Sequence, residues 1–319
     1  MEFRGVLGHD RQKFMLSSLV RKEKLPHALL FSGPRGVGKR TIALELVKNL
    51  FCKKRCACGA CIGCRRLASG THPDFTLLAG ETSIKIDELR AIRREVYQAP
   101  FEAPVRVILI DNAEVMTREA ANALLKTLEE PPPSNVFILV TSLEQEIPLT
   151  VRSRCMRIGF GPLSADEVCS YFQTALSYDA ARAKVLASLS SGSIASGLFW
   201  MDPENFRMRE RIARLVMEKR GFASVALVAE RIAAKGYETE YLSFLLAFFR
   251  DLWWLSQTGE PTGLVNGDLR EIMEQRGPVR PGWAEASIAR VHESVRTLRY
   301  NVNRLLAMEH LMIDLKRPI

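Results

Sequence analysis

Residues 28–41 read Ala28-Leu29-Leu30-Phe31-Ser32-Gly33-Pro34-Arg35-Gly36-Val37-Gly38-Lys39-Arg40-Thr41, a short apolar run that leads into a glycine-rich turn. The run predicts a buried strand, and residues 41–51 carry apolar side chains at helical spacing. Between them the turn has the form G-x-x-x-x-G-K, in which backbone N–H groups converge on phosphate oxygens at a helix N-terminus. We therefore expect Gly33, Gly36, Gly38 and Lys39 to form a phosphate cradle for a nucleotide.

Two positions depart from the pattern of a hydrolysing enzyme. The residue after Lys39 normally offers a hydroxyl to Mg²⁺, but here it is Arg40, whose guanidinium has no acceptor atom, and Thr41 comes one residue late. Asp111, at the end of a later apolar run, is able to bind a metal, but Asn112 follows where Glu is usual. Asparagine cannot take a proton from water. We expect weak or absent ATP hydrolysis, and the binding of ATP or ADP stays open.

Apolar runs and helical periods alternate through about the first 160 residues. We expect strands at 28–31, 75–79, 105–110 and 136–141, with helices at 41–51, 87–97 and 117–130. This alternation predicts an α/β domain with a mostly parallel sheet covered on both faces. Beyond it the pattern is almost all helical and begins with a capping box, Ser164 and Glu167. The predicted domains are residues 1–160, a small helical unit at 161–203 and a larger all-α unit at 204–319.

Five of the seven cysteines lie in the segment 52–64, which interrupts the α/β pattern. Closely spaced thiolates in a reducing compartment most simply bind a tetrahedral Zn²⁺. The C-x₂-C-x₂-C run supplies Cys58, Cys61 and Cys64, and the fourth ligand is Cys52 or Cys56. We favour Cys52, because its longer loop is able to wrap around the ion. Four thiolates leave no place for an activated water, so the predicted zinc is structural; free or redox-active thiols are the alternative.

The composition is that of a globular protein, and the net positive charge indicates a polyanionic partner. The chain is 47% hydrophobic and 25% charged, with a net charge of +9. DNA or RNA is the simplest partner for that charge, although a merely basic surface also explains it. No apolar segment follows the N-terminal residues as a signal peptide requires, and the most apolar stretch, 241–255, is too short to cross a membrane. The sequence therefore predicts a soluble, cytoplasmic protein without a membrane partner.

Three motifs together resemble the DNA clamp-loader subunits. They are the cysteine-rich insertion, the tripeptide Ser153-Arg154-Cys155, and the run Ala121-Asn122-Ala123-Leu124-Leu125-Lys126-Thr127-Leu128-Glu129-Glu130-Pro131-Pro132. The resemblance is dense over residues 5–160 and weaker over 301–315. It implies an AAA+ P-loop domain with an inserted zinc knuckle, a helical lid and a helical collar for oligomerisation. Five such subunits form a hetero-pentameric ring that opens a sliding clamp and places it on primer–template DNA.

Within the family, the pattern resembles the delta-prime branch of DNA polymerase III subunits more than the gamma/tau motor branch. Gly70-Thr71-His72-Pro73-Asp74 is similar to the delta-prime form, and Arg40 and Asn112 depart from a working motor. The motor's ATP-sensing arginine would fall near Ala195 and is absent. The resemblance implies gamma/tau-type and delta-type ring partners. It also implies that Arg154 is an arginine finger, acting in trans at the ATP site of a neighbouring subunit.

Two other functions are compatible with parts of the pattern. The first is a gamma/tau-type motor that hydrolyses ATP with Lys39 and Asp111. The second is a zinc-knuckle protein that binds nucleic acid alone, and we disfavour it because residues 52–64 contain no aromatic side chain to stack on bases. Arg40 and Asn112 argue against the motor, so we do not expect the chain to be an ATPase by itself.

Overall fold

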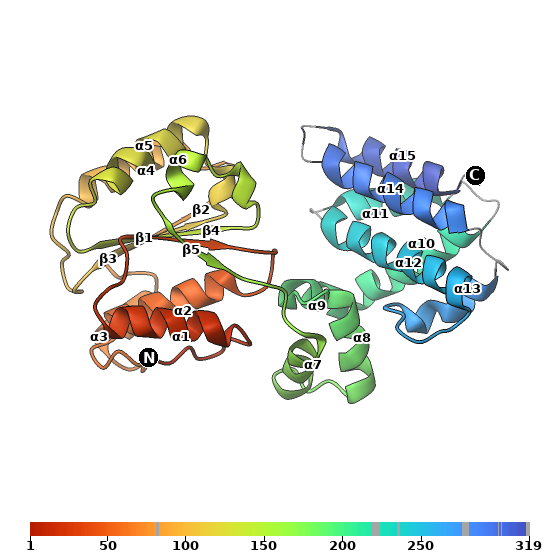
Figure 1. Cartoon of the computed structure of the whole chain (residues 1–319), viewed down its shortest axis with the longest axis horizontal. Coiled ribbons are helices and arrows are strands. Elements are labelled where there is room, and N and C mark those ends of the chain that lie inside the picture. Colours follow the sequence, from red (N-terminus) through yellow and green to blue (C-terminus); the bar gives the residue numbers. More distant parts are fainter. Residues whose placement is uncertain are drawn as a thin grey trace. The chain divides into compact units, whose positions relative to one another are not determined.

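The computed structural model describes residues 1–80, 83–218, 224–234, 237–275, 281–298, 300 and 302–316. The chain forms two compact units, Met1–Glu167 and Val168–Ile319 (Figure 1). All gaps in the description except 81–82 fall in the predicted collar range 204–319. The predicted division between lid and collar falls inside the second unit and stays a prediction.

The first unit is built on one parallel sheet, which confirms the α/β prediction. Its strands, in the order β2-β3-β4-β1-β5, are β1 (Ala28–Ser32), β2 (Phe75–Ala79), β3 (Arg106–Asp111), β4 (Asn135–Thr141) and β5 (Met156–Gly159). Every neighbouring pair is parallel. The short edge strand β5 was not among the expected strands. Because the strands are parallel, their carboxyl ends lie at the same edge of the sheet. The loop after β1 and Asp111 at the end of β3 are therefore at one edge, separated by β4.

Helices cover both faces of this sheet (Figure 1). One face packs against α1 (Asp10–Arg21) and α2 (Lys39–Phe51), with α3 (Ile62–Ala68) beside them. The other packs against α4 (Ile86–Glu95), α5 (Arg118–Glu129) and α6 (Leu149–Arg152). Two short 3₁₀ turns, η1 (Ala113–Val115) and η2 (Glu144–Glu146), follow the carboxyl ends of β3 and β4.

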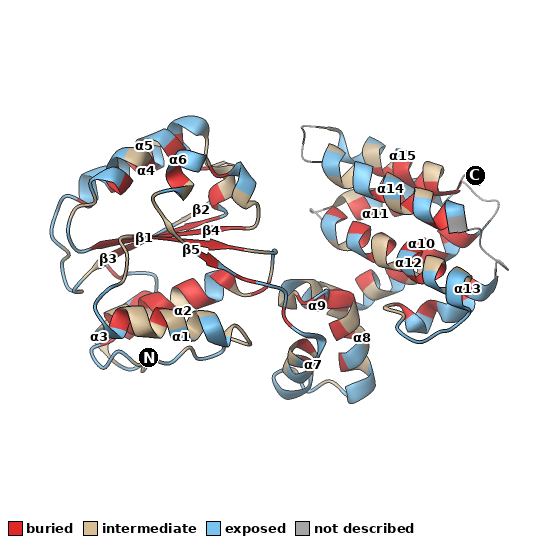
Figure 2. Cartoon of the chain, in the orientation of Figure 1, coloured by how far each residue is buried: buried red, intermediate tan, exposed pale blue. Residues whose placement is uncertain are grey.

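The burial pattern of β1 shows that the sheet separates two hydrophobic cores, one on each face. Leu29 and Phe31 join the core formed with α1 and α2, whereas Ala28 and Leu30 join the core formed with α4 and α5. Successive side chains of a strand point to opposite faces, so an unbroken apolar run fills both cores. The sheet is accordingly buried along its central strands (Figure 2).

The second unit is helical throughout its described residues. Its helices are α7 (Ala165–Thr174, which begins at the end of the first unit), α8 (Ala180–Ser190), α9 (Ile194–Met201), α10 (Pro203–Met217), α11 (Val225–Ala233), α12 (Glu238–Thr258), α13 (Arg270–Gln275), α14 (Pro281–Thr297) and α15 (Arg304–Lys316), with the 3₁₀ turn η4 (Gly267–Leu269). The predicted capping box is confirmed, since Ser164 N donates to Glu167 Oε2 at 2.8 Å and Glu167 N to Ser164 Oγ at 3.2 Å. Trp200 of α9 packs edge-on against Tyr241 of α12, with ring centroids 5.6 Å apart.

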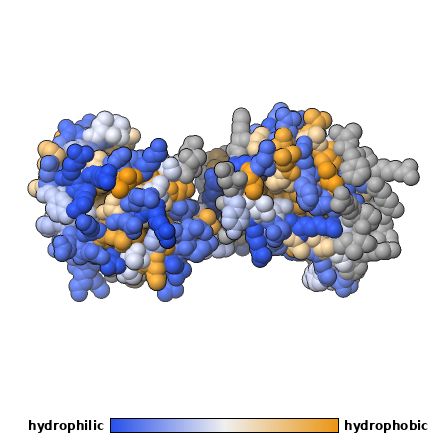
Figure 3. Space-filling view, turned by 90° about the horizontal axis from the view of Figure 1, so that it is seen from above, coloured by the Kyte–Doolittle hydropathy of each residue, from blue (hydrophilic) through white to orange (hydrophobic). Residues whose placement is uncertain are grey.

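The surface in view in Figure 3 is largely hydrophilic, with separate hydrophobic patches on both units. Among the described residues, none of the helices has the length and apolar character needed to cross a membrane.

Candidate functional site

The loop between β1 and α2 has the backbone of a phosphate cradle. Gly33 has φ 152°, and a Cβ there would lie 2.1 Å from the carbonyl oxygen of Phe160. Gly36 and Gly38 also have positive φ, 75° and 101°, and Gly38 is the N-cap of α2. These conformations favour glycine strongly, so the sequence pattern reflects a real requirement of the turn. The predicted glycines therefore lie together at the N-terminus of α2.

Lys39 is turned back onto its own loop. Its ammonium donates to the carbonyl oxygens of Gly33, at 2.7 Å, and Pro34, at 2.6 Å. The residue is only 6% exposed, and this burial lowers the pKa of Lys39 to about 8, against the opposing charges of Glu114 and Asp111. A phosphate that used this ammonium would have to compete with two carbonyl oxygens of the chain itself.

Arg40 stands where the pattern of a hydrolysing enzyme has a hydroxyl ligand for Mg²⁺, and it makes an ion pair instead. Its Nη1 lies 3.4 Å from Oδ2 of Asp111, so a guanidinium faces the carboxylate that would otherwise bind Mg²⁺. Thr41 is exposed one residue further along α2, about 100° around the helix from Arg40. Asn112 adopts a left-handed conformation, φ 54°, and its Nδ2 donates to Gly80 O at 3.3 Å. The loop and the acidic strand end thus meet as predicted, but an internal ion pair joins them.

Sequence analysis gave no role to two side chains of this region. His9 Nε2 contacts Val37 O at 2.8 Å from the N-terminus of α1. Glu114 Oε1 accepts from Ser142 Oγ at 2.6 Å and Ser142 N at 3.1 Å. Burial raises the pKa of the Glu114 carboxyl, but the hydrogen bonds from Ser142 outweigh it and bring the pKa below its usual range. Glu114 is the fourth residue of the run that starts at Asp111, and this acidic run was the one sequence signal for its carboxylate. No local sequence pattern indicated a role for His9.

The cysteine-rich segment brings four sulfurs together. The Sγ atoms of Cys52, Cys58, Cys61 and Cys64 all lie within 4.8 Å of one another. Zn–S bonds of about 2.3 Å place the sulfurs of a tetrahedral site about 3.8 Å apart, so the four thiols fit a zinc ion after a small contraction. Cys56 is not part of this group. The geometry therefore agrees with Cys52, rather than Cys56, as the fourth ligand.

Local structure prepares this group for a cation. Cys52 caps the end of α2, and Cys61 is the N-cap of α3. Burial raises the pKa of the Cys52 thiol, but backbone N–H groups, with those of Cys58 and Cys56 the strongest, lower it to about 5. Burial raises the pKa of Cys64 to about 12. A cation at the centre of this group would favour the deprotonated form of all four thiols.

The run Gly70–Asp74 fastens the knuckle to the sheet. His72 stacks on Phe51, the residue before Cys52, with ring centroids 4.0 Å apart. Asp74 is fully buried, and its carboxylate accepts the backbone N–H groups of residues 101, 102 and 103 at 2.7, 2.8 and 2.9 Å. The motif thus orders the end of α2 and the loop before β3. Its contacts are structural, and none reaches the phosphate cradle.

Arg154 lies between α6 and β5 in the first unit. None of the hydrogen bonds described for it involves a residue of the phosphate cradle. Its Nη1 donates to Thr150 O at 2.9 Å and Ser153 Oγ at 3.3 Å, and its Nη2 to Glu129 Oε1 at 2.7 Å. The side chain remains 35% exposed. It is therefore accessible to another molecule while its own chain holds it in place.

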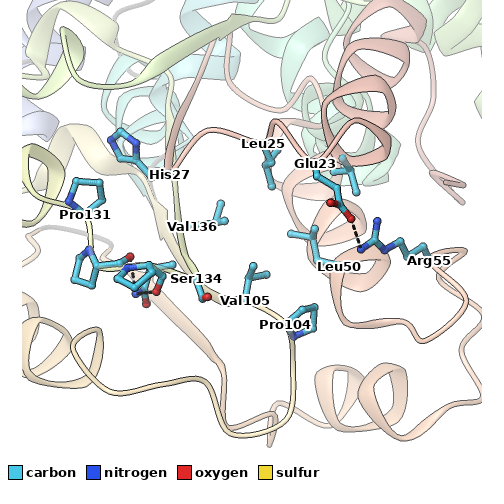
Figure 4. A pocket seen from close by; sticks show the side chains of 14 residues that line it. Glu23, Leu25, His27, Leu50, Arg55, Pro104, Val105, Pro131, Ser134 and Val136 are labelled. Carbon is cyan, nitrogen blue, oxygen red and sulfur yellow. Dashed lines mark hydrogen bonds and ion pairs between the residues drawn. The ribbon is translucent and has the colours of Figure 1, made fainter.

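Two cavities flank the sheet at opposite edges. One, of about 530 Å³, lies beside the phosphate cradle and is lined by residues that include Gly33, Ser142 and Arg157. The other, of about 390 Å³, lies where β1, β3 and β4 begin, and His27, Val105 and Val136 line it (Figure 4). Ligands of open parallel sheets bind at the carboxyl ends of the strands. The second cavity is therefore not part of the nucleotide site.

The strand order, the glycine loop and the acidic end of β3 define a P-loop α/β protein. Residues 8–164 match the family model described as DNA polymerase III, delta subunit. DNA polymerase III subunit delta-prime of Bacillus subtilis (strain 168) is 29% identical over 95% of this chain and 94% of its own length. The delta-prime subunit of Pseudomonas aeruginosa is also 29% identical, over 95% of both chains.

Gamma subunits of DNA polymerase III and a gamma-related protein are also similar to the chain. DNA polymerase III subunit gamma of Buchnera aphidicola subsp. Schizaphis graminum is 33% identical over 61% of this chain and 56% of its own length. A solved gamma subunit-related protein of Thermotoga maritima has 18% identity and a TM-score of 0.48, over 94% of this chain and 98% of its own. The chain belongs to the delta-prime family of DNA polymerase III clamp-loader subunits, and its first unit is a P-loop α/β module.

Proposed function

We propose that this chain is a subunit that does not hydrolyse ATP itself and supplies Arg154 to the ATP site of a neighbouring subunit. Its partners are gamma/tau-type and delta-type subunits in a hetero-pentameric ring. The ring opens a sliding clamp and places it on primer–template DNA, and the subunit works in the cytoplasm, where bacterial DNA is replicated. The predicted collar at 204–319 carries the contacts of assembly, and the predicted lid at 161–203 precedes it.

One observation carries the proposal: the chain's own nucleotide site is occupied by its own cations. Arg40 is paired with Asp111, and Lys39 donates to two carbonyl oxygens of its loop. A nucleotide that binds Gly33, Gly36, Gly38, Lys39 and Thr41 would meet a guanidinium where Mg²⁺ is expected. Since Asn112 supplies no base, a bound ATP would be hydrolysed weakly or not at all. These features disfavour the gamma/tau-type motor.

Zinc has a structural part in this proposal. Cys52, Cys58, Cys61 and Cys64 would hold the ion and so close the segment between α2 and α3. All four positions are sulfur, so the ion would have no open coordination place for catalysis. Its contribution would be to hold the knuckle, which His72 and Phe51 connect to the sheet.

The test is ATP hydrolysis by the reconstituted ring with Arg154→Ala in this subunit. An arginine finger is typically worth about 10³–10⁵ in rate at the site it serves, so turnover at one site should fall severely. Arg90→Ala is the matched control, because that side chain is 62% exposed and pairs with Asp87 of its own helix. Unchanged turnover with Arg154→Ala would remove the finger. Hydrolysis by the isolated chain that depends on Lys39 would favour the motor instead.

A further inference from the structure

The guanidinium of Arg154 is held at three points by its own chain. Arginine has five N–H donors, and three of them serve Thr150 O, Ser153 Oγ and Glu129 Oε1. Among the described residues, no hydrogen bond is found for Nε of Arg154, and Nη2 has only the bond to Glu129. One N–H on each of these two nitrogens therefore remains free. These N–H groups are available to another molecule, and charge-assisted hydrogen bonds of this kind are the ones a guanidinium makes to phosphate.

Glu129 is an unusual residue at its position. It is the last residue of α5, and an acidic side chain there faces the negative end of the helix dipole. Its side chain is 48% exposed, so burial does not require it. The favourable contact that it makes is the 2.7 Å ion pair with Arg154, 25 residues further along the chain. This ion pair compensates the unfavourable interaction of the carboxylate with the helix dipole.

We infer that Glu129 is a positioning residue for Arg154. Its carboxylate, with Thr150 O, holds the guanidinium in place and leaves the remaining N–H groups of Nε and Nη2 to a nucleotide phosphate on the neighbouring subunit. The inference rests on the finger role proposed above. It adds that the helix carrying the clamp-loader signature, α5, sets the orientation of the finger.

The expected effect is modest because the ion pair is exposed. Such pairs are worth about 0.2–1 kcal/mol, which corresponds to a change of about 1.4- to 5-fold in the fraction of correctly oriented fingers. The effect should fall on the hydrolytic step, since the finger contributes where charge develops in the transition state. The affinity of the ring for ATP and its assembly should not change.

The experiment compares rings that carry Glu129→Ala, Glu129→Gln, Arg154→Ala or the double variant Glu129→Ala/Arg154→Ala. The matched control is Glu130→Ala, because Glu130 is exposed and its side chain makes no ion pair with any described residue. We expect Glu129→Ala to lower kcat at the site that Arg154 serves about 1.4- to 5-fold, at unchanged KM for ATP. Glu129→Gln keeps an acceptor and should fall between, and the double variant should be no slower than Arg154→Ala.

Each outcome separates the two ideas. If Arg154→Ala is slow but Glu129→Ala equals Glu130→Ala, the positioning role is wrong and the finger stands. A rise in kcat with Glu129→Ala would also overturn it, because the carboxylate would then restrain the finger. If Arg154→Ala leaves the rate unchanged, the proposed function itself fails. Elution of each ring as one complex ensures that a lower rate is not a loss of assembly.

Discussion

Replacing Cys52 with serine should abolish the zinc-dependent stability of the first unit, whereas Cys56→Ser should leave it intact. The two cysteines lie four residues apart in the same segment, which makes them a matched pair. Cys52 belongs to the group of sulfurs within 4.8 Å of one another, and Cys56 does not. Cys52 is also 2% exposed, so the serine hydroxyl that replaces its thiolate has no solvent to compensate the loss.

The size of the effect follows from binding linkage. An ion that binds only the folded state stabilises it by about 4.1 kcal/mol when its free concentration is a thousand times its Kd. In a unit the size of Met1–Glu167, each kcal/mol shifts the Tm by about 2–4 °C. The wild-type chain and Cys56→Ser should therefore gain about 8–16 °C from zinc. Cys52→Ser should lose most of that gain.

The assay is thermal unfolding followed by circular dichroism, with and without a chelator, alongside metal analysis of each purified protein. Wild type and Cys56→Ser should carry about one zinc per chain and respond to the chelator. The reasoning is refuted if Cys56→Ser loses the metal while Cys52→Ser keeps it. Less than about half an equivalent of zinc in wild type purified without chelator would remove the site altogether.

Two further changes probe the nucleotide loop. Arg40→Thr removes the 3.4 Å ion pair and offers a hydroxyl beside Asp111, so calorimetry should show tighter binding of Mg·ADP. We expect no gain in hydrolysis, because Asn112 remains. Equal binding of Mg·ADP by the variant and the wild type would show that Arg40 does not block the metal. Burial lowers the pKa of Lys39 to about 8 from 10.5, so between these values the folded chain releases a proton that the unfolded chain keeps. The unfolding free energy of wild type minus that of Lys39→Met should therefore rise from pH 8 to 10.5, and a flat or falling difference in urea unfolding would contradict the burial.

The central strands were predictable because each is an unbroken apolar run. All residues of β1, β3 and β4 are buried, so their sequences had to be apolar or internally paired throughout. The edge strand β5 gives no such signal. Of its residues Met156–Gly159 only Ile158 is buried, because this strand has a neighbour on one side only. A short, half-exposed strand is set by its pairing with β1, which the local pattern does not encode.

The site was predictable where its chemistry is local in sequence. The glycine loop and the cysteine run each lie within about a dozen residues, so their spacing alone indicated which atoms meet. The pair of Arg40 with Asp111 joins the start of α2 to the end of β3, and it exists because the strand order brings both to one edge. The pair of Glu129 with Arg154 likewise joins the end of α5 to the segment between α6 and β5. Neither partner follows from periodicity.

The residues that we propose prevent hydrolysis also stabilise the loop. Arg40 pairs with Asp111, a nearly buried carboxylate, and Lys39 donates to two loop carbonyls. Asn112 occupies a left-handed conformation that asparagine tolerates better than most residues, and its amide binds Gly80 O. A motor subunit needs nucleotide and metal to balance these same groups. In this chain Arg40 and Lys39 balance these groups without a ligand.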